Sequence, residues 1–349
     1  MCSSDLASSA GITLASDGSV AVQTQTGMRN RLINGQFSID QRNAGVDTVV
    51  ASAAYGPDRW KMLGEDNLGK LKAKDTTVGG GRFNLALTCV TANNKYGVLQ
   101  FIEGINCKDL RGKTVTLTAN LSVSNTRLGN IKMGIIEWTS TEDSPTSNPI
   151  STWNVEGTTP TLAANFTFKN TPANLNVTTT PTAYSVSATL GTTFTNLAVF
   201  IWNDDKSFTA SDIVYITDVQ LETGSLATPY EARLIGAELA LCQRYYNKSY
   251  DTTTTPGTST YNGCYSGSGW YATAGVSWGG ANFVFPVTMR AVPSLTTYST
   301  DGTIGYFYTS TMNRIVVGTN IGQTKAFAYS DQFNYNEKWY IHYTAAAEI

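Results

Sequence analysis

The sequence predicts an all-β fold: an antiparallel jelly-roll or β-sandwich domain, one linking α-helix, and a smaller C-terminal β-sandwich domain. The first observation is strict alternation of apolar and polar residues. In "TVTLTANLSV" (residues 114–123), Val115, Leu117 and Ala119 share one face, and threonines fill most of the other, as in a half-exposed antiparallel strand. The second observation is the turn-forming clusters between such segments, for example "VGGGR" and "TSTEDSPTSNP". Many short strands separated in this way are typical of a sandwich or jelly roll.

The composition excludes several classes of function. The chain has 349 residues, enough for two domains, and only 14% of them are charged. A net charge of −2 without a basic stripe argues against nucleic-acid binding. No run approaches the roughly 18 apolar residues that insert into a membrane. The single histidine, His342, and five cysteines without a CxxC pair argue against most metal sites and against a disulfide framework. We therefore expect no cofactor.

These patterns divide the chain into four segments. The first is a polar lead-in that alternates around the Asp17-Gly18 dipeptide, which predicts one weak hairpin. The second carries strand after strand, and "NLAVFIW" and "DIVYITDVQLE" within it are apolar on both faces, as in central strands. The third is helical, and the last is again rich in strands. The expected boundaries are residues 1–29, 30–229, 230–250 and 251–349.

The third segment contains the one convincing helical pattern, "ELALCQRYY". Pro229 precedes it, and apolar residues then recur at helical spacing, which predicts an amphipathic helix. The stripe consists of Ile235, Leu239, Cys242 and Tyr246, widened by Leu234, Leu241 and Tyr245.

Acidic pairs offer little evidence of catalysis or metal binding. Asp204 with Asp205, and Glu142 with Asp143, lie in turn-like stretches, where Asp is favoured for turn formation. A glycosidase needs two carboxylates across a cleft, and we expect no catalytic residue. Asp204 and Asp205, near Asp212, form a weak Ca²⁺ candidate, but a solvated turn is the preferred interpretation. We expect no metal.

Residues 251–349 hold nearly half of the aromatic residues of the chain in under a third of its length. Alternation assigns some of them to the core: Trp270, Trp278, Phe283, Phe285, Trp339 and Tyr343. The surplus lies off this face or in loops, mixed with planar amides and a carboxylate. Flat rings beside such hydrogen-bonding groups hold a sugar ring or a protein loop, although ordinary surface or subunit-interface tyrosine is the alternative. The candidate binding residues are Tyr261, Asn262, Tyr265, Tyr271, Tyr306, Tyr308, Asp331, Asn334, Tyr335 and Tyr340.

Four blocks of sequence, taken in order, carry a resemblance to a known family. They are "NRLINGQFSIDQRNAG" (30–45) with "YGPDRWKM" (55–62), "ITDVQLETGSLATPYEARLIGAELALCQRYYNKSY" (216–250), "FPVTMRAVPSL" (285–295), and the closing "YTAAAEI". In this combination the chain resembles bacteriophage tail-fibre and receptor-binding proteins. From the residues themselves, Arg42, Arg59 and Arg233 are expected to pair with structural partners such as Asp58, Glu222 or Glu231.

The resemblance implies a jelly roll similar to carbohydrate-binding modules, a connecting helix and a variable β tip. It also implies a homotrimeric, non-enzymatic virion fibre that is assembled in the host cytoplasm. The C-terminal domain would bind a host glycan or outer-membrane protein, and residues 1–29 would dock onto the phage tail or an adaptor. Part of the helix would contact neighbouring chains around a threefold axis, with Leu234, Leu241 and Tyr245 as interface candidates.

Two alternatives from other classes stay open at this point. One is a structural virion protein, such as a head decoration or a fibre connector, without receptor binding. The other is a glycan-degrading tailspike, although the sequence lacks both a parallel β-helix repeat and a regularly spaced acidic pair.

Overall fold

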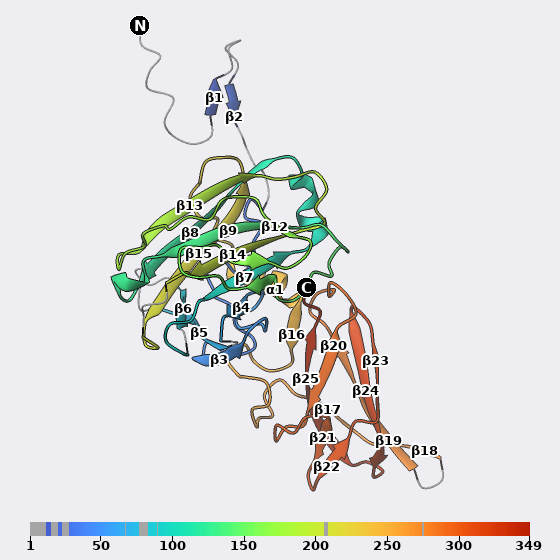
Figure 1. Ribbon diagram of the computed structural model, residues 1–349. Helices are drawn as coiled ribbons and strands as arrows, with labels where there is room; N and C mark the ends of the chain where they lie inside the picture. Colours follow the sequence, from blue (N-terminus) through green and yellow to red (C-terminus); the bar gives the residue numbers. More distant parts are fainter. Residues whose placement is uncertain are drawn as a thin grey trace.

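The described part of the protein is all-β with one α-helix, as the sequence predicts. The computed structural model describes residues 28–66, 68–76, 83–88, 90–205, 209–273 and 276–349, and the strands at 12–14 and 20–22. Every strand pairing in this described part is antiparallel. Figure 1 shows two bodies of strands, one above the other, with the C terminus where they meet.

The jelly-roll unit, as we name the upper body, consists of two sheets packed face to face. The first sheet has the order β12-β9-β14-β7-β4 and the second β13-β8-β15-β6-β5-β3. The first comprises β4 (Lys61–Gly64), β7 (Tyr96–Ile102), β9 (Ile131–Trp138), β12 (Phe166–Phe168) and β14 (Asn196–Asn203). The second comprises β3 (Thr48–Ala51), β5 (Leu68–Asp75), β6 (Asn84–Thr88), β8 (Thr114–Val123), β13 (Thr182–Thr189) and β15 (Ile213–Thr223).

Short elements connect these strands. They are the pair β10 (Ile150–Thr152) and β11 (Thr161–Leu162), and the 3-10 turns η1 (Gly104–Asn106), η2 (Lys108–Leu110) and η3 (Thr126–Leu128). At the N-terminal end, β1 (Ile12–Leu14) pairs with β2 (Val20–Val22), as the alternation predicts. The Asp17-Gly18 turn between them lies outside the described residues.

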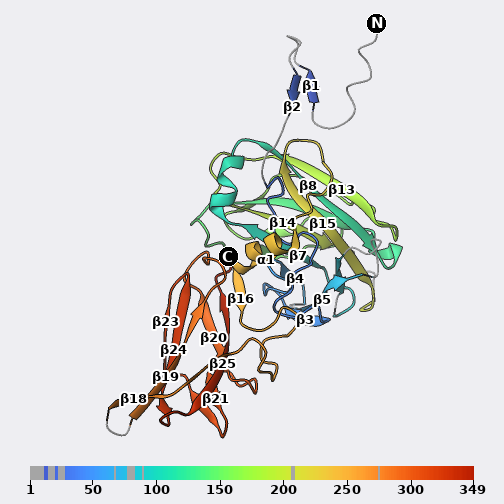
Figure 2. The same cartoon turned by 180° about the vertical axis from the view of Figure 1, so that it is seen from behind.

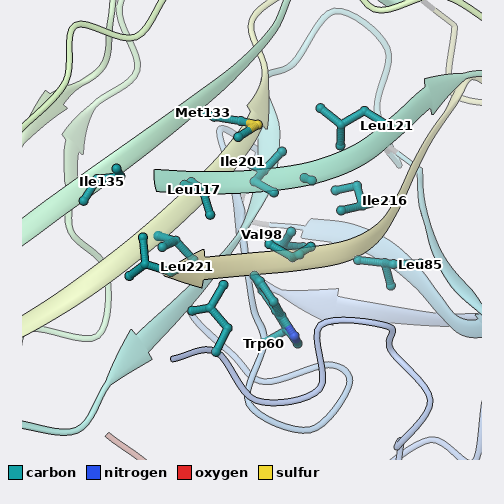
Figure 3. Packing of buried hydrophobic residues seen from close by; sticks show 14 of the residues in the cluster. Trp60, Leu85, Val98, Leu117, Leu121, Met133, Ile135, Ile201, Ile216 and Leu221 are labelled. Carbon is teal, nitrogen blue, oxygen red and sulfur yellow. The ribbon is translucent and has the colours of Figure 1, made fainter. Parts of the chain in front are cut away.

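Aliphatic side chains from both sheets fill the space between them (Figure 3). Strand β8 shows why: Val115, Leu117, Ala119, Leu121 and Val123 are all buried in this core, on the face that the alternation predicts. Strand β14 is buried along its whole length, as expected of a central strand. Its second face joins a smaller cluster that also contains the last residue of the chain.

The helix is shorter than predicted, and the predicted apolar stripe does not match the buried face of the helix. Helix α1 spans Ile235–Gln243 and lies beside the jelly-roll unit, toward the C-terminal body (Figure 2). Ile235 is 61% exposed, whereas the polar Glu238 is buried. Glu238 faces inward because it accepts hydrogen bonds from the backbone of Asn34 and from Arg233. Tyr246 lies beyond the helix, in a strand.

The C-terminal unit, as we name the lower body, begins directly after the helix. In its first sheet the long strand β25 (Lys338–Ala346) pairs with β16 (Tyr246–Lys248), β17 (Tyr265–Ser268), β20 (Ser294–Tyr298) and β21 (Tyr306–Thr309), and β21 pairs with β22 (Asn313–Ile315). The second has the order β18-β19-β24-β23. It comprises β18 (Trp270–Thr273), β19 (Val276–Val284), β23 (Gly318–Ile321) and β24 (Lys325–Phe333).

Aromatic side chains and alanines form the core of the C-terminal unit. The predicted core residues Phe283, Phe285, Trp339 and Tyr343 are buried there, but Trp270 is 46% exposed. The prediction for Trp270 is wrong because it lies in the short strand β18 at the edge of its sheet. Within the described chain, no helix is long and apolar enough to cross a membrane.

Candidate functional site

Three tyrosines gather on the outer face of the first sheet of the C-terminal unit. Alternation sends Trp339 inward and Tyr340 outward along β25, and Phe307 inward and Tyr308 outward along β21. Tyr308 and Tyr340 are direct cross-strand partners. Tyr261, from the loop before β17, packs edge-on against both, with ring centroids 6.1 Å from Tyr308 and 5.1 Å from Tyr340. We call Tyr261, Tyr308 and Tyr340 the tyrosine patch.

The tyrosine patch is accessible and lies away from the jelly-roll unit. Tyr261 is 54% exposed, and Tyr308 and Tyr340 are half-buried. Strands β21 and β22 stand at the far end of the C-terminal unit (Figure 1). The hydroxyl of Tyr261 raises the pKa of Tyr308, so Tyr308 keeps its proton at neutral pH. The patch thus presents flat rings with hydroxyl groups that donate and accept hydrogen bonds.

A carboxylate that the sequence did not single out borders the patch. Asp301 accepts hydrogen bonds from the hydroxyls of Ser299 and Thr303 and from Asn313 Nδ2, the last at 2.9 Å. The bond from Ser299 is the main reason why the pKa of Asp301 is lowered to about 2. Asp301 is therefore ionised at any physiological pH, and Asn313 lies directly across from Tyr308 in the β21–β22 pair. In the sequence, the only local pattern that marks the position of Asp301 is the turn-forming stretch "TDGT".

The other predicted binding residues have different positions. Tyr265 belongs to the core, because its ring packs edge-on against Phe283 at 5.1 Å and against Tyr343, so its predicted surface role is wrong. Tyr306 is half-buried, on the same side of β21 as Tyr308, and Asn262 is exposed beside Tyr261. The side chain of Tyr271 lies outside the described residues.

Asp331, Asn334 and Tyr335 form a second exposed group. They lie at the end of β24 and in the turn that leads to β25, and Tyr335 is 65% exposed. The turn is fixed by Glu337, which accepts from the Asn334 backbone at 2.8 Å and pairs with Arg314 at 3.1 Å. This group is a second exposed surface of the C-terminal unit.

The single histidine has a structural environment. His342 is buried and stacks on the ring of Tyr250 at 3.9 Å. Its Nδ1 is 2.9 Å from the Ser249 hydroxyl, and its Nε2 is 3.1 Å from the carbonyl oxygen of Thr260. Burial lowers its pKa. These contacts hold the loop that carries Tyr261 against the sheet.

The acidic pairs are occupied by intrachain partners. Asp204 is fully buried and pairs with Lys95 at 2.5 Å and with Lys132 at 2.7 Å. Two ammonium groups on this carboxylate leave no role for Ca²⁺, so the candidate site at Asp204 and Asp205 is wrong. Burial raises the pKa of Asp205 to about 6. Among the described residues, no group of three or more His, Cys, Asp or Glu side chains could hold a metal ion.

The second acidic pair also has intrachain partners. Glu142 pairs with Lys108 at 2.6 Å. Asp143 accepts hydrogen bonds from the Gly104 backbone at 2.8 Å and from Asn196 at 2.6 Å. Neither carboxylate is held in the arrangement of an acid and a base across a cleft.

The sequence blocks that carry the family resemblance meet where the two units touch. Arg59 is 1% exposed. Its guanidinium pairs with Glu348, donates to the Phe101 carbonyl oxygen at 2.7 Å and stacks 3.6 Å above the ring of Tyr245. Arg42 pairs with the same Glu348 at 2.9 Å. We call Arg42, Asp58, Arg59, Tyr245 and Glu348 the joint.

Further contacts close the joint. Asp58 accepts from the Gln41 backbone at 2.9 Å and lies 3.7 Å from Arg42, so Asp58 is a partner of one of the three arginines, as expected. The Tyr55 hydroxyl donates to the terminal carbonyl oxygen of Ile349 at 2.6 Å. Arg290, from the block at 285–295, donates to the backbone oxygens of residues 347 and 348. These residues are therefore structural: they fasten the C-terminal unit to the jelly-roll unit.

The remaining predicted ion pairs are partly confirmed. Arg233 lies 3.8 Å from Glu231, but its closer partner is Glu238 at 3.3 Å. Glu222 pairs with Arg29 at 3.3 Å.

The three interface candidates differ in exposure. Leu234 is 84% exposed, and Leu241 is half-buried in a shallow groove that Met28 and Ile33 also line. Tyr245 is 1% exposed, and its hydroxyl donates to Glu103 at 2.8 Å. The prediction of an interface role for Tyr245 is wrong, because its ring and hydroxyl are both used inside the chain.

Neither a known protein family nor a curated protein matches the sequence. Solved structures with distant likeness include the CBM22-1 and GH10 modules of Clostridium thermocellum endo-1,4-β-D-xylanase 10B (16% identity, 59% of this chain and 30% of that chain, TM-score 0.36). A sugar-binding protein candidate from Bacteroides thetaiotaomicron has 13% identity over 56% of this chain and 100% of that chain (TM-score 0.35). The active domain of bacteriophage CBA120 tailspike protein 4 has 12% identity over 56% of this chain and 22% of that chain (TM-score 0.30).

Proposed function

We propose that this chain is a bacteriophage tail-fibre adhesin that binds a host-surface glycan, without cleaving it, through its C-terminal unit. The observation that carries the proposal is the tyrosine patch: three rings in mutual contact on an outer sheet face, bordered by the ionised Asp301. Aromatic faces pack against the apolar side of a sugar ring, while the hydroxyls and the carboxylate hydrogen-bond its hydroxyl groups. The resemblance of four ordered sequence blocks to tail-fibre proteins supports the virion context.

The separation between joint and patch suits an adhesin. The joint holds the C-terminal unit against the jelly-roll unit through buried ion pairs, so the patch at the far end has a fixed orientation. A shallow patch of three rings binds one sugar residue weakly. Several copies on one fibre raise the overall avidity by about 10²–10⁴ without any new contact.

A glycan array with the purified full chain tests the binding site. Tyr308→Ala and Tyr261→Ala should each reduce binding at least tenfold, because each removes one wall of the patch. Phe83→Ala, at an exposed aromatic residue of the jelly-roll unit (40% exposed), is the matched control and should leave binding unchanged. Loss of binding in Tyr335→Ala alone would instead assign the site to the turn before β25.

The same protein separates the two alternative functions. A structural virion protein would bind no glycan and no host cell, and would not block phage adsorption. A glycan-degrading tailspike would shorten host polysaccharide, as read by size-exclusion chromatography. The adhesin proposal requires binding to cells and polysaccharide chains of unchanged length.

We also propose a homotrimer as the assembly of the fibre. Its support is the exposure of large apolar residues at the start of the helix and at Met28: Leu234 is 84% exposed, Ile235 61% and Met28 57%. Exposed apolar residues in such a group are typical of protein contacts. Sedimentation analysis should give three copies for the wild-type chain and a lower mass for Leu234→Asp, with unchanged circular dichroism. A monomeric wild-type chain at micromolar concentration would contradict the trimer.

Residues 1–29 are proposed to attach the fibre to the phage tail or an adaptor protein. A chain that starts at Met28 should keep its glycan binding, because the joint and the patch both lie after this residue. It should fail to join phage particles in a complementation assay. Normal incorporation of the shortened chain would place the attachment surface elsewhere.

A further inference from the structure

A cavity of about 250 Å³ lies on the outer face of the second sheet of the jelly-roll unit. Strands β8, β13 and β15 and the segment at 228–230 surround it. Its lining consists of Thr118, Asn120, Ala183, Asp218, Gln220, Thr228, Pro229 and Tyr230. The volume is slightly below the roughly 300–1,000 Å³ of most small-molecule sites, which suits a single small ring rather than a long chain.

A ladder of hydroxyl groups runs along β8 and β13 toward this cavity. Thr114 Oγ1 lies 3.0 Å from Thr189 Oγ1, and Thr116 Oγ1 lies 2.8 Å from Ser187 Oγ. At these two positions each side chain on β8 finds a partner on β13, as is usual for polar cross-strand pairs.

At the next two positions the side chains of β8 and β13 form no such hydrogen-bonded pairs. Thr118 stands opposite Ser185, and Asn120 stands opposite Ala183. The Thr118 hydroxyl and the Asn120 carbonyl oxygen are buried and have no hydrogen-bond partner among the described residues. Buried polar atoms without partners are uncommon because each loses its hydrogen bonds to water without gaining others. Both residues line the cavity.

The opposite wall is polar and fixed by the chain. Gln220 is 1% exposed; its Oε1 accepts from the Glu231 backbone at 2.8 Å, and its Nε2 donates to Glu222 at 3.0 Å. A bulge in β15 places Asp218 at φ 51°, and its carboxylate accepts from Gln36 at 2.8 Å. These side chains cannot turn to satisfy Thr118 and Asn120 without breaking their own bonds. The wall is thus preorganised for a ligand.

The chemistry of the lining selects the class of ligand. The half-buried ring of Tyr230 and the ring of Pro229 provide apolar surfaces, and the other groups are hydroxyls, amides and one carboxylate. The eight lining residues include no Lys, Arg or His, and the carboxylate of Asp218 would repel an anion. A neutral ring that carries several hydroxyl groups satisfies both kinds of surface.

We infer that this cavity binds one neutral sugar residue, and that the jelly-roll unit is a second carbohydrate-binding site distinct from the tyrosine patch. The inference does not rest on the proposed function of the C-terminal unit. Thr118 and Asn120 would bond the sugar hydroxyls, and Tyr230 would cover one face of the ring.

Saturation-transfer NMR on the full chain tests this site with methyl glycosides of glucose, galactose, mannose and N-acetylglucosamine as probes. All chains carry Tyr308→Ala, so that binding at the tyrosine patch does not contribute. At least one probe should receive saturation from this background chain. Adding Ala183→Leu should abolish the transfer by filling the cavity, and adding Thr118→Val should weaken binding at least fivefold by removing one hydroxyl.

Thr114→Val is the matched control, because its hydroxyl pairs with Thr189 outside the cavity, and it should leave the transfer unchanged. Thermal melting of each variant shows whether it is folded. If Ala183→Leu does not fold, the comparison of Thr118→Val with Thr114→Val tests the inference. Absence of transfer for all four probes, or equal transfer in Thr118→Val and Thr114→Val, would overturn the inference. Such a result would leave the glycan-array test of the patch unaffected.

Discussion

The joint and the tyrosine patch use the same residue type in opposite ways. In the joint, Tyr245 is buried beneath the guanidinium of Arg59 and bonded to Glu103. In the patch, Tyr261 is exposed and contacts other tyrosines. The comparison shows that burial and packing partners, rather than the residue type, distinguish these tyrosines.

The two regions also differ in how they treat charge. The joint buries Arg59 and Asp58 and leaves the side chain of Glu348 only 9% exposed. Glu348 pairs with Arg59 and Arg42, and Asp58 lies close to Arg42. The patch has one bordering carboxylate, Asp301, which stays exposed and ionised. Substitutions in the joint should therefore change the free energy of unfolding, and substitutions in the patch should change binding.

Arg59→Met should have the largest effect on stability. It leaves Glu348 with one fewer cation in a buried site and removes the donor to the Phe101 carbonyl oxygen. We expect a loss of about 3–5 kcal/mol in urea unfolding, as for other broken buried ion pairs. The control is Arg31→Met, whose pair with Asp109 is exposed at 27% and 49%, and it should cost less than about 1 kcal/mol. Equal losses in both variants would show that the joint adds little stability.

The second largest effect should be the change in the free energy of unfolding with pH. Burial raises the pKa of Asp58 from 3.8 to about 6. The folded state then binds this proton more tightly than the unfolded state, so the stabilisation is complete below pH about 4 and is lost as the pH rises through about 6. The free energy of unfolding should fall across this window, by at most about 1.4 kcal/mol per pH unit for one proton.

Urea unfolding at pH 4, 5, 6 and 7 measures this slope, and Asp58→Asn should reduce it. Asp205, with a pKa raised to about 6, contributes separately to the pH dependence of the free energy of unfolding, and Asp205→Asn should remove this contribution. Asp301 in the patch has the opposite shift, to about 2, so its contribution is lost only as the pH falls below about 4. An unchanged slope in Asp58→Asn would mean that Asp58 does not titrate in this window.

Removing one hydroxyl from each region gives the smallest and most direct comparison. Tyr245→Phe loses the bond to the buried Glu103 carboxylate and should cost about 1.5–3 kcal/mol. Tyr308→Phe, on the patch, should stay within about 0.5 kcal/mol of the wild type. Thermal and urea unfolding of the two variants side by side check this, and a larger loss in Tyr308→Phe would reverse the roles assigned to the two regions.

Local patterns predicted the strands well and the helix poorly. The alternation of apolar and polar residues is a property of neighbouring positions, so the inward face of β8 could be predicted from residues 115–123. The end of the helix could not be predicted in this way, because Tyr246 belongs to a strand and pairs with Ala346 in β25. A partner one hundred positions away gives no signal in the local sequence.

The candidate site was predictable only in part, for the same reason. The surplus of aromatic residues pointed to Tyr261, Tyr308 and Tyr340, but not to their mutual contact. Tyr265 was assigned to the surface because its inward direction depends on the register with Ile341 in β25. The resemblance to tail-fibre proteins marked the blocks around Arg42 and Arg59, yet only the structure brings them to a shared Glu348.

The pairing of Arg59 with Glu348 sets a constraint on how the chain folds in time. The two residues are 289 positions apart, and contacts of such long sequence separation form slowly. At about 5–20 residues per second of synthesis, the strands of the jelly-roll unit leave the ribosome many seconds before their last partner. The pair between Arg59 and Glu348 can therefore form only after residue 348 has been synthesised, and the strands of the jelly-roll unit are made before this partner exists.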